Sequence, residues 1–471
     1  MAEIYRLRST DRLIGDDNEL EEQSIYFASL AELNDPMEGF RNIYMQGDEI
    51  VWRNLFRHYV YCLHQIRILY SITAETEPIT GENISVNVNF VREENVKLVH
   101  LFEEILERID GNEPLKEFLN EVAQVKRRVS IDEVSIYLRL FHFFALEEIQ
   151  QTYSDRGLLP KYERYPKAAR LVEQFKKSLR LVNILNRESD QKVILEISAR
   201  TLEGLFMLHK YQWSRSPDNT IGNNGNFLLF DFTRSYLDKV ESLIFPCWYV
   251  ACFMRTHNNS STWAKYGDGH NGVCLIFETE TESDREFLSL REKTVSSSQL
   301  YDGETRRLEV QDVNYGSEAL EFDFFRSIGR LPEQDLRDIW YMSPNGNMSE
   351  CGSHLVTEPE TWRQEYWKNF SLISTSKSKD WKYEEECRVV LSSIFDDLQD
   401  ERRRKLKYDF RSLKGIIFGI GTSDSDKFKI FDVIERKCRN HGRSEFDFYQ
   451  AFYSRKSDDI GRYKLIWKIA L

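Results

Sequence analysis

The spacing of hydrophobic residues changes twice along the chain. Near the amino terminus, EIYRLRS (residues 3–9) and SIYFAS (residues 24–29) contain β-branched and aromatic residues typical of strands, which predicts two short strands. The sequence NDP at residues 34–36 then predicts a turn. Over residues 51–213, apolar residues recur every three or four positions, which predicts amphipathic helices. Alternation typical of strands returns after about residue 240.

These changes predict an α+β protein built from two parts. Residues 1–50 and 213–471 are expected to form a strand-rich core, and residues 51–212 an all-helical insertion. The amino-terminal strands should pair in one sheet with strands from after about residue 240, without the helical block. Aromatic residues such as those in LFHFFAL (residues 140–146) either pack in the core of that block or form a helix-to-helix homodimer contact.

The stretch KSKDWKYEEECRVVL (residues 377–391) carries the most distinctive pattern of charges. Cys387, Val389 and Leu391 have the strand period of two and predict a buried face. The opposite face then holds four charged residues, namely Lys382, Glu384, Glu386 and Arg388. Such a row is either an exposed ion-pair ladder or the wall of a pocket whose guanidinium binds an anion.

Composition narrows the classes of function. The 471 residues are 41% hydrophobic and 13% aromatic, which is enough for one large core or two ordinary ones. Lys and Arg number 64 against 77 Asp and Glu, and the net charge of −13 disfavours non-specific binding to duplex DNA. No apolar run approaches the roughly 20 residues of a membrane span. The first residues lack the apolar segment of a signal peptide, so we expect a cytoplasmic protein without membrane contact.

The sequence lacks the common nucleotide-binding and metal-binding motifs, or shows them in the wrong structural context. Gly267, Gly269 and Gly272 fit G-x-G-x-x-G, but a helical pattern precedes them and a strand follows, the reverse of a dinucleotide-binding loop. The sequence contains no G-x-x-x-x-G-K-[ST] phosphate loop. The seven cysteines have no C-x-x-C spacing, so reduced buried thiols and no metal site are expected.

Several segments together resemble one protein family. They are YRLRS, IYFASLAELNDP, the Cys252 and Phe253 pair, WAKYGDGHNGVCLIF, the W-x-x-E-x-E-C-R pattern of residues 381–388, and IIFG at residues 416–419. In this order they strongly resemble the mostly bacterial family catalogued as domain of unknown function 2971. The resemblance covers about half of the chain, and the family name implies no activity.

A weaker resemblance, to the ADP-ribosyltransferase fold, points to an activity. The first strand with Tyr5 and Arg6, the second strand SIYFAS and the late strand YEEECRVV are similar in order to three motifs that meet around NAD in that superfamily. Arg6 stands where many members have His, and no clear S-T-S motif is present. The resemblance implies a mixed split-sheet core that uses NAD as co-substrate and transfers ADP-ribose to a macromolecular acceptor, protein or nucleic acid, or cleaves NAD.

The chemistry of NAD cleavage suggests roles for individual residues. Breaking the bond between nicotinamide and ribose passes through an oxocarbenium-like state that a carboxylate stabilises, which predicts Glu386 and Glu384 as catalytic residues, with the larger share for Glu386. Arg6 would bind phosphate and Tyr26 would contact nicotinamide, unless Tyr26 packs in the core and Arg6 pairs with one of the glutamates. The resemblance adds three residues to the NAD site: Ser29, Tyr266 and Arg388.

The sequence therefore makes a geometric prediction and leaves alternatives open. Arg6, Tyr26, Tyr266 and Glu386 should surround one cleft, with Cys387 buried behind it. The favoured function is a toxin-like NAD-dependent effector, with a role in bacterial anti-phage defence suggested by the resemblance. One alternative is a nuclease using the charged residues of the stretch at 377–391, and a divalent-metal requirement would favour it. The other is a sensor or scaffold whose helical block binds a protein partner.

Overall fold

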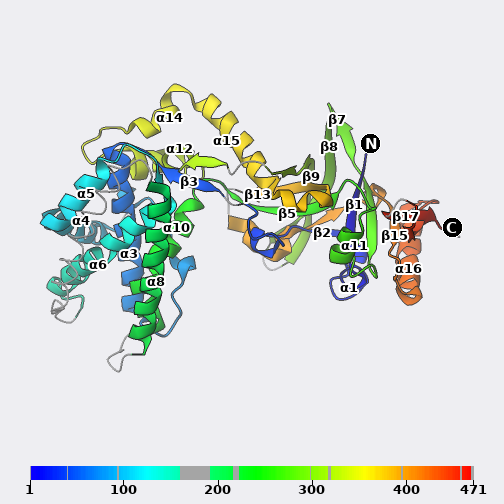
Figure 1. Cartoon of the computed structure of the whole chain (residues 1–471), viewed down its shortest axis with the longest axis horizontal. Coiled ribbons are helices and arrows are strands. Elements are labelled where there is room, and N and C mark those ends of the chain that lie inside the picture. Colours follow the sequence, from blue (N-terminus) through cyan, green and yellow to red (C-terminus); the bar gives the residue numbers. More distant parts are fainter. Residues whose placement is uncertain are drawn as a thin grey trace. The chain divides into compact units, whose positions relative to one another are not determined.

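The structure is a computed structural model of an α+β protein, in which two compact units can be described. It describes residues 2–39, 41–92, 95–159, 191–215, 222–296, 299–316, 320–393, 396–456 and 459–467. Unit 1 comprises Met1–Phe40, Pro246–Leu320 and Lys368–Leu471, and unit 2 comprises Arg41–Phe245 and Glu321–Trp367. The main helices and strands of both units are labelled in Figure 1.

Unit 1 is built on one mixed sheet, which has twelve strands in the described part of the chain. Along the sheet the order is β17, β16, β15, β6, β1, β5, β13, β9, β8, β14 and β2, with β7 paired to β8. The strands are β1 (Glu3–Arg8), β2 (Ser24–Tyr26), β5 (Cys247–Met254), β6 (Val273–Glu278), β7 (Glu280–Glu282), β8 (Arg285–Ser296), β9 (Gln299–Asp312), β13 (Glu386–Ser393), β14 (Lys405–Tyr408), β15 (Leu413–Phe418), β16 (Asp447–Ser454) and β17 (Asp459–Lys464).

The sheet is nearly split between β1 and β5. β1 pairs with β6 along its whole length, and β5 pairs with β13 along its whole length, both antiparallel. Between β1 and β5, in contrast, the described residues form a single pair, Tyr5 with Met254. The sheet therefore consists of two well-paired blocks that separate beyond this pair, and it is a mixed sheet of an α+β protein, as the sequence predicts.

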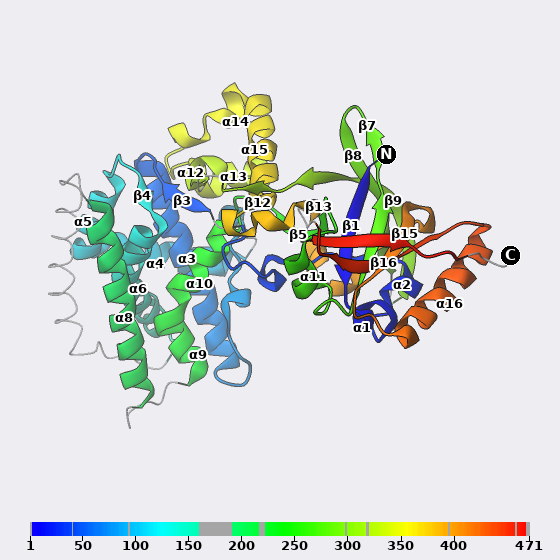
Figure 2. The ribbon, with the colours of Figure 1, turned by 45° about the vertical axis from the view of Figure 1, so that its right-hand side comes forward.

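Helices cover both faces of this sheet. One face packs against α1 (Thr10–Ile14), α2 (Glu19–Glu22) and α16 (Asp424–His441), which bury Leu13, Leu20 and Ile430 in the larger apolar core. The opposite face packs against α11 (Ser260–Tyr266) through the fully buried Trp263. Figure 2 shows α11 and α16 beside the strands of unit 1. Two further short strands, β10 (Asn314–Tyr315) and β12 (Ser376–Lys377), pair with each other.

Unit 2 is mainly helical. Its longer helices are α3 (Glu49–Thr73), α4 (Val96–Gly111), α5 (Glu113–Ala123), α6 (Ile131–Asp155), α8 (Gln191–Ser214) and α10 (Phe232–Glu241). Its short helices are α9 (Asn223–Asn226), α12 (Phe324–Ser327), α13 (Glu333–Leu336) and α14 (His354–Thr357), and α15 (Pro359–Ser374) begins in unit 2 and ends in unit 1. A small sheet joins β11 (Glu321–Asp323), β3 (Asn42–Met45) and β4 (Val129–Ser130).

The amino-terminal strands divide between these sheets. β1 and β2 pair with strands from after residue 240, as the sequence predicts, because β1 adjoins β5 and β6 and β2 adjoins β14. For β3 the expectation holds only in part, because β3 pairs with β11 from after residue 240 but also with β4 from the helical block, in a separate small sheet. Residues 213–245 and 321–367, expected in the strand-rich core, lie in unit 2. The short β11 and helices of 321–367 pack there because β11 pairs with β3.

Candidate active site

A cavity of about 440 Å³ lies in unit 1 and is lined by residues from five segments. Its volume is within the range of small-molecule sites. Arg6, Tyr26, Tyr266 and Glu386 all line it, together with Glu384. The predicted convergence of these residues is therefore confirmed, and the chemical roles assigned to them stay predictions. Cys387 is fully buried in the apolar core of the sheet, as expected.

The cavity occupies the opening between β1 and β5. Consecutive residues of a strand project to opposite faces, yet the cavity is lined by all of Tyr5–Arg8 from β1 and by Cys252–Met254 from β5. Tyr5, Met254 and Glu386 form one cross-strand row and share a face. Arg6 and Arg8 belong to the opposite face. Because the sheet is open here, arginines of one face and glutamates of the other line the same cavity.

Local capping positions the residues on the glutamate side. The Asn259 side chain accepts hydrogen bonds from the backbone N–H of Ser261 and Thr262 and starts α11, so that Tyr266 ends that helix at the cavity. Ser378 caps the 3₁₀ helix η7 (Lys379–Glu384) in the same way. Glu385 follows with φ of +44°, a left-handed conformation that stops the helix and turns the chain into β13.

This turn corrects one prediction from the sequence. The strand period does not extend back from Glu386, because Lys382 and Glu384 lie in η7 and not on β13. Lys382 is exposed, whereas Glu384, Glu386 and Arg388 are buried. The four charged residues therefore do not form one face of a strand, and the reading of the stretch as an exposed ladder is wrong.

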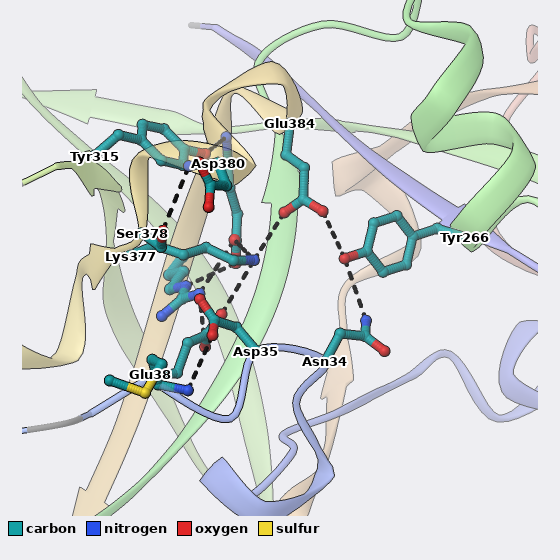
Figure 3. Close-up of polar contacts among 12 residues, drawn as sticks. Asn34, Asp35, Glu38, Tyr266, Tyr315, Lys377, Ser378, Asp380 and Glu384 are labelled. Atoms are coloured by element: carbon teal, nitrogen blue, oxygen red, sulfur yellow. Dashed lines mark hydrogen bonds and ion pairs between the residues drawn. The ribbon is translucent and has the colours of Figure 1, made fainter.

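Three carboxylates and two cations form a buried ion network. The Lys377 Nζ lies 3.1 Å from Glu38, 2.8 Å from Glu384 and 2.9 Å from Glu386. The Arg388 guanidinium lies 2.7 Å from Glu386 and 2.9 Å from Glu38. All five side chains are at most 4% exposed. In Figure 3 the Lys377 side chain reaches the centre of the group, with Glu384 between it and Tyr266.

Electrostatic contacts in the network favour the ionised forms of Glu386, Lys377 and Arg388. Burial raises the pKa of Glu386, but Arg388 and Lys377 outweigh it and lower that pKa to about 2. Burial lowers the pKa of Lys377, yet Glu386 and Glu38 raise it above its ordinary value. Counted by formal charge, three glutamates against Lys377 and Arg388 give the network a net charge of −1.

The Lys377 ammonium lies at the centre of the three carboxylates. A metal ion bound by these carboxylates would need the same position. The ammonium contacts one oxygen of each of three glutamates. Among the residues that the structure describes, no group of three or more His, Cys, Asp or Glu side chains is arranged to hold a metal ion. Backbone pairing fixes the lysine, because β12 places Lys377 beside Tyr315 of β10, whose hydroxyl accepts from the Glu386 backbone N–H at 2.7 Å.

The two glutamates of the predicted catalytic pair differ in how fully they are bound. Both oxygens of Glu386 accept from Arg388, and one of them also accepts from Lys377. Each oxygen of Glu384 accepts one hydrogen bond from the described residues, one from Tyr266 at 2.7 Å and the other from Lys377 at 2.8 Å. A carboxylate oxygen has two lone pairs, so Glu384 keeps acceptor capacity that it can offer to a ligand in the cavity.

Tyr266 fixes the orientation of Glu384. Its hydroxyl donates to Glu384 and accepts from the Asn34 side-chain N–H at 3.2 Å, as Figure 3 shows. Burial, followed by the negative charge of Glu384, raises the pKa of Tyr266 above its ordinary value. The hydroxyl therefore stays protonated at neutral pH and remains a donor. Asn34 belongs to the turn expected at residues 34–36, so this turn supports the site.

Tyr26 and Ser29 are bound to Glu32. The Tyr26 hydroxyl donates to Glu32 at 2.7 Å, and the Ser29 hydroxyl and backbone N–H donate to it at 2.6 and 2.7 Å. Arg404 forms an ion pair with the same carboxylate at 2.9 Å. Tyr26 is half-buried and lines the cavity, so it is not simply a core residue. Ser29 and Arg388 are not among the residues that line the cavity.

Arg6 has an unusual environment for a buried cation. The residue is 4% exposed, and its Nη2 donates to the Tyr26 carbonyl at 3.2 Å. Its guanidinium lies 5.3 Å from the Phe253 ring centroid. Among the described residues it forms no ion pair, so the alternative of a pair with Glu384 or Glu386 is wrong. Burial, followed by the charge of Arg8, lowers the pKa of Arg6 to about 9.

Sequence reasoning missed two members of the network. Lys377 begins the charged stretch, but its place on a separate short strand gave it no role in the period-two pattern. Glu38 lies 350 residues before Arg388 in sequence and reaches it only through the fold. One signal in the sequence could have indicated Glu38. It lies just after the turn at residues 34–36, and this turn ends IYFASLAELNDP, one of the segments that resemble the family.

The fold and cavity define an α+β protein with a charged site at the opening of a split sheet. Residues 262–389 match the model of the family described as "Protein of unknown function (DUF2971)", which confirms the resemblance stated above. The match covers about a quarter of the chain and includes Tyr266, Lys377, Glu384 and Glu386, whereas Arg6 lies outside it.

Other comparisons add no functional information. No curated protein and no solved structure matches the chain. In the described part of the chain, no helix combines the length and the apolar character needed to cross a membrane. All seven cysteines are free thiols, and five of them are buried.

Proposed function

We propose that the protein binds NAD in this cavity and breaks the bond between nicotinamide and ribose, transferring ADP-ribose to a macromolecular acceptor or to water. The observation that carries the proposal is the Glu384 carboxylate. It lines the cavity, is held by Tyr266 and Lys377, and keeps lone pairs free for a ligand. Preorganised negative charge of this kind stabilises a developing cation without reorganisation during the reaction.

The ion network suits an oxocarbenium-like transition state. In NAD cleavage the electron pair of the bond from ribose C1′ to nitrogen leaves with nicotinamide, which becomes neutral, and C1′ gains positive charge. The acceptor oxygen or nitrogen then forms a bond to C1′ and loses a proton. A buried network with net charge −1 beside this carbon lowers the barrier, as carboxylates do in glycoside cleavage.

We assign different roles to the two glutamates. Glu384 contacts the ribose or the acceptor, because its oxygens have unused acceptor capacity. Glu386 positions Lys377 and Arg388, since its oxygens are already bound to both cations. This proposal gives the larger catalytic share to Glu384, where the sequence pattern favoured Glu386.

Aromatic side chains support the choice of a nicotinamide ligand. Tyr26 and Tyr266 both line the cavity and come from different segments, with their hydroxyls bound to Glu32 and Glu384. Rings fixed by their polar ends present apolar faces against which a planar ring can pack. The order of a first strand with Arg6, a second with Tyr26 and a late strand beginning at Glu386 supports an ADP-ribosyltransferase-like core for unit 1. Action as a cytoplasmic, toxin-like effector in anti-phage defence rests on the resemblance.

The test is incubation of the full chain with NAD labelled in the adenosine part, with and without a cell extract. We expect free nicotinamide in both reactions and label on macromolecules when the extract is present. Glu384→Gln should abolish most of the release. Glu385→Gln is the matched control, because this neighbouring carboxylate is exposed and does not line the cavity. Absence of nicotinamide release by the wild-type chain under both conditions would refute the proposal.

The same preparation separates the alternatives. Cleavage of RNA or DNA that requires magnesium would favour the nuclease, although Lys377 already occupies the centre of the carboxylate group. Inertness toward NAD and nucleic acids, combined with a stable complex formed by unit 2, would favour the sensor or scaffold.

A further inference from the structure

Five cations line the cavity, namely Arg6, Arg8, Arg12, Lys265 and Lys377, and they differ in how their charge is compensated. The ammonium of Lys265 lies over the Trp381 ring, 3.4 Å from its centroid. Lys377 is neutralised by the glutamates, and Arg8 forms an ion pair with Glu19 at 2.9 Å. Arg6 and Arg12 also line the cavity from β1 and α1, but the described residues place no carboxylate within 4 Å of either. The side of the sheet that carries Arg6 and Arg8 therefore has positive charge that the protein does not compensate.

Arg6 is the strongest indication of a missing anion. Its Nη1 is buried and has no hydrogen-bond partner in the described structure. A charged group that is nine-tenths or more buried without a counter-ion costs several kcal/mol unless something else compensates it. Phe253 and the Tyr26 carbonyl fix the guanidinium, but neither neutralises it. A guanidinium held in this way matches the oxygens of a phosphate group.

We propose that Arg6, with Arg8 and Arg12 beside it, forms an anion site for the phosphate groups of the ligand, on the opposite side of the sheet opening from the glutamate network. The ligand class is then a molecule with a phosphate or pyrophosphate group and a cationic leaving group. A dinucleotide with a positively charged ring has this charge distribution. The orientation of the ligand rests on the proposed function, whereas the anion site rests on Arg6 and its surroundings alone.

The experiment is calorimetric titration of the full chain with inorganic pyrophosphate. We expect the wild type to bind it and Arg6→Met to bind at least tenfold more weakly, since a charged hydrogen bond contributes about 1.5 kcal/mol or more. Arg6→Lys should retain part of the affinity. Arg12→Ala, a change of an exposed side chain that leaves the core intact, should weaken binding about threefold. Arg411→Met is the control, because Arg411 is exposed and does not line the cavity.

The outcomes distinguish this site from the proposed function. No binding of pyrophosphate by the wild type, or equal binding by wild type and Arg6→Met, would overturn the anion site. Binding that depends on Arg6 in a chain that releases no nicotinamide from NAD would support the anion site and refute the proposed function. Nicotinamide release that is unchanged in Arg6→Met would support the function and count against the anion site.

Discussion

The two charged regions of the cavity differ in whether the protein itself neutralises their buried charges. On one side, Lys377 and Arg388 are surrounded by three glutamates at 2.7–3.1 Å. On the other side, Arg6 is as deeply buried but has one hydrogen bond to a carbonyl and an unbonded Nη1. Buried charges that compensate one another depend on all their partners, because removing one leaves the others unpaired, whereas a charge that is buried without compensation lowers stability and is retained for a ligand. The difference suggests that the first region is held rigid by its own ion pairs, with Glu384 keeping acceptor capacity for a ligand, and that the charge of the second region is left for a ligand to neutralise.

The largest effect should come from removing the central lysine. Lys377→Met leaves three buried glutamates with Arg388 alone, so we expect the free energy of unfolding to fall by about 4 kcal/mol. Chemical denaturation measures this loss. Lys379→Met, which changes an exposed lysine two residues away, should alter stability by less than about 0.5 kcal/mol. Equal stabilities of the two variants would show that the network is not a compensated unit.

The network should also determine stability in acid. The pKa of Glu386 is about 2 in the folded protein and about 4.5 when unfolded, so its contribution is present above pH 4.5 and is lost as the pH falls toward 2. We expect about 3 kcal/mol to be lost in this window. Denaturation of the wild type and of Glu386→Gln between pH 6 and 2 checks it. A wild type whose stability falls no more steeply than that of the variant would contradict the lowered pKa.

Catalysis should depend on Glu384 more than on its neighbours. Glu384→Gln keeps the shape of the side chain but removes its charge, so we expect NAD turnover to fall about 100-fold, or about 2.7 kcal/mol in the barrier. Glu385→Gln should retain wild-type turnover. The measurement is the initial rate of nicotinamide release by folded protein. If the rate of nicotinamide release falls less in Glu384→Gln than in Glu386→Gln, Glu386 and not Glu384 is the main catalytic residue.

The smallest predicted effect is a gain in stability, where the preceding substitutions are expected to cause losses of stability or activity. Because burial lowers the pKa of Arg6 to about 9 from 12.5, the guanidinium is still charged in the folded protein below pH 9, and its burial lowers the stability of the fold over that whole range. Arg6→Met removes this cost and should raise the free energy of unfolding at pH 7 by about 2 kcal/mol. Thermal unfolding without ligand measures the change. A clear loss of stability would mean that Arg6 has a structural role in the free protein.

The sequence predicted which segments meet but not how they meet. Arg6, Tyr26, Tyr266 and Glu386 were brought together correctly because each lies in a segment of the resembling families. The alternation seen around Cys387 was extended too far toward the amino terminus, since the Ser378 cap and the left-handed Glu385 replace a strand with a 3₁₀ helix. Such local conformations are not visible in a hydrophobic pattern.

The missing partners depended on long-range geometry. Glu38 contacts Lys377 and Arg388, which lie more than 300 residues later, and no spacing rule connects them. The unpaired state of Arg6 could not be predicted either, because it requires knowing that the sheet opens between β1 and β5 and separates the arginine from the glutamates. The pairing of β11 with β3, which lies nearly 280 residues earlier in the chain and groups residues 321–367 with unit 2, is likewise a long-range contact that the hydrophobic pattern does not reveal.

An experimental structure of the protein with NAD tests the central claim most directly. The Glu384→Gln variant is suited to it, because slow turnover preserves the ligand. The account predicts NAD in the cavity, with a pyrophosphate oxygen about 3 Å from Arg6 Nη1 and the nicotinamide ribose next to residue 384. NAD bound elsewhere, or bound in the cavity with Arg6 Nη1 still lacking a partner, would contradict it.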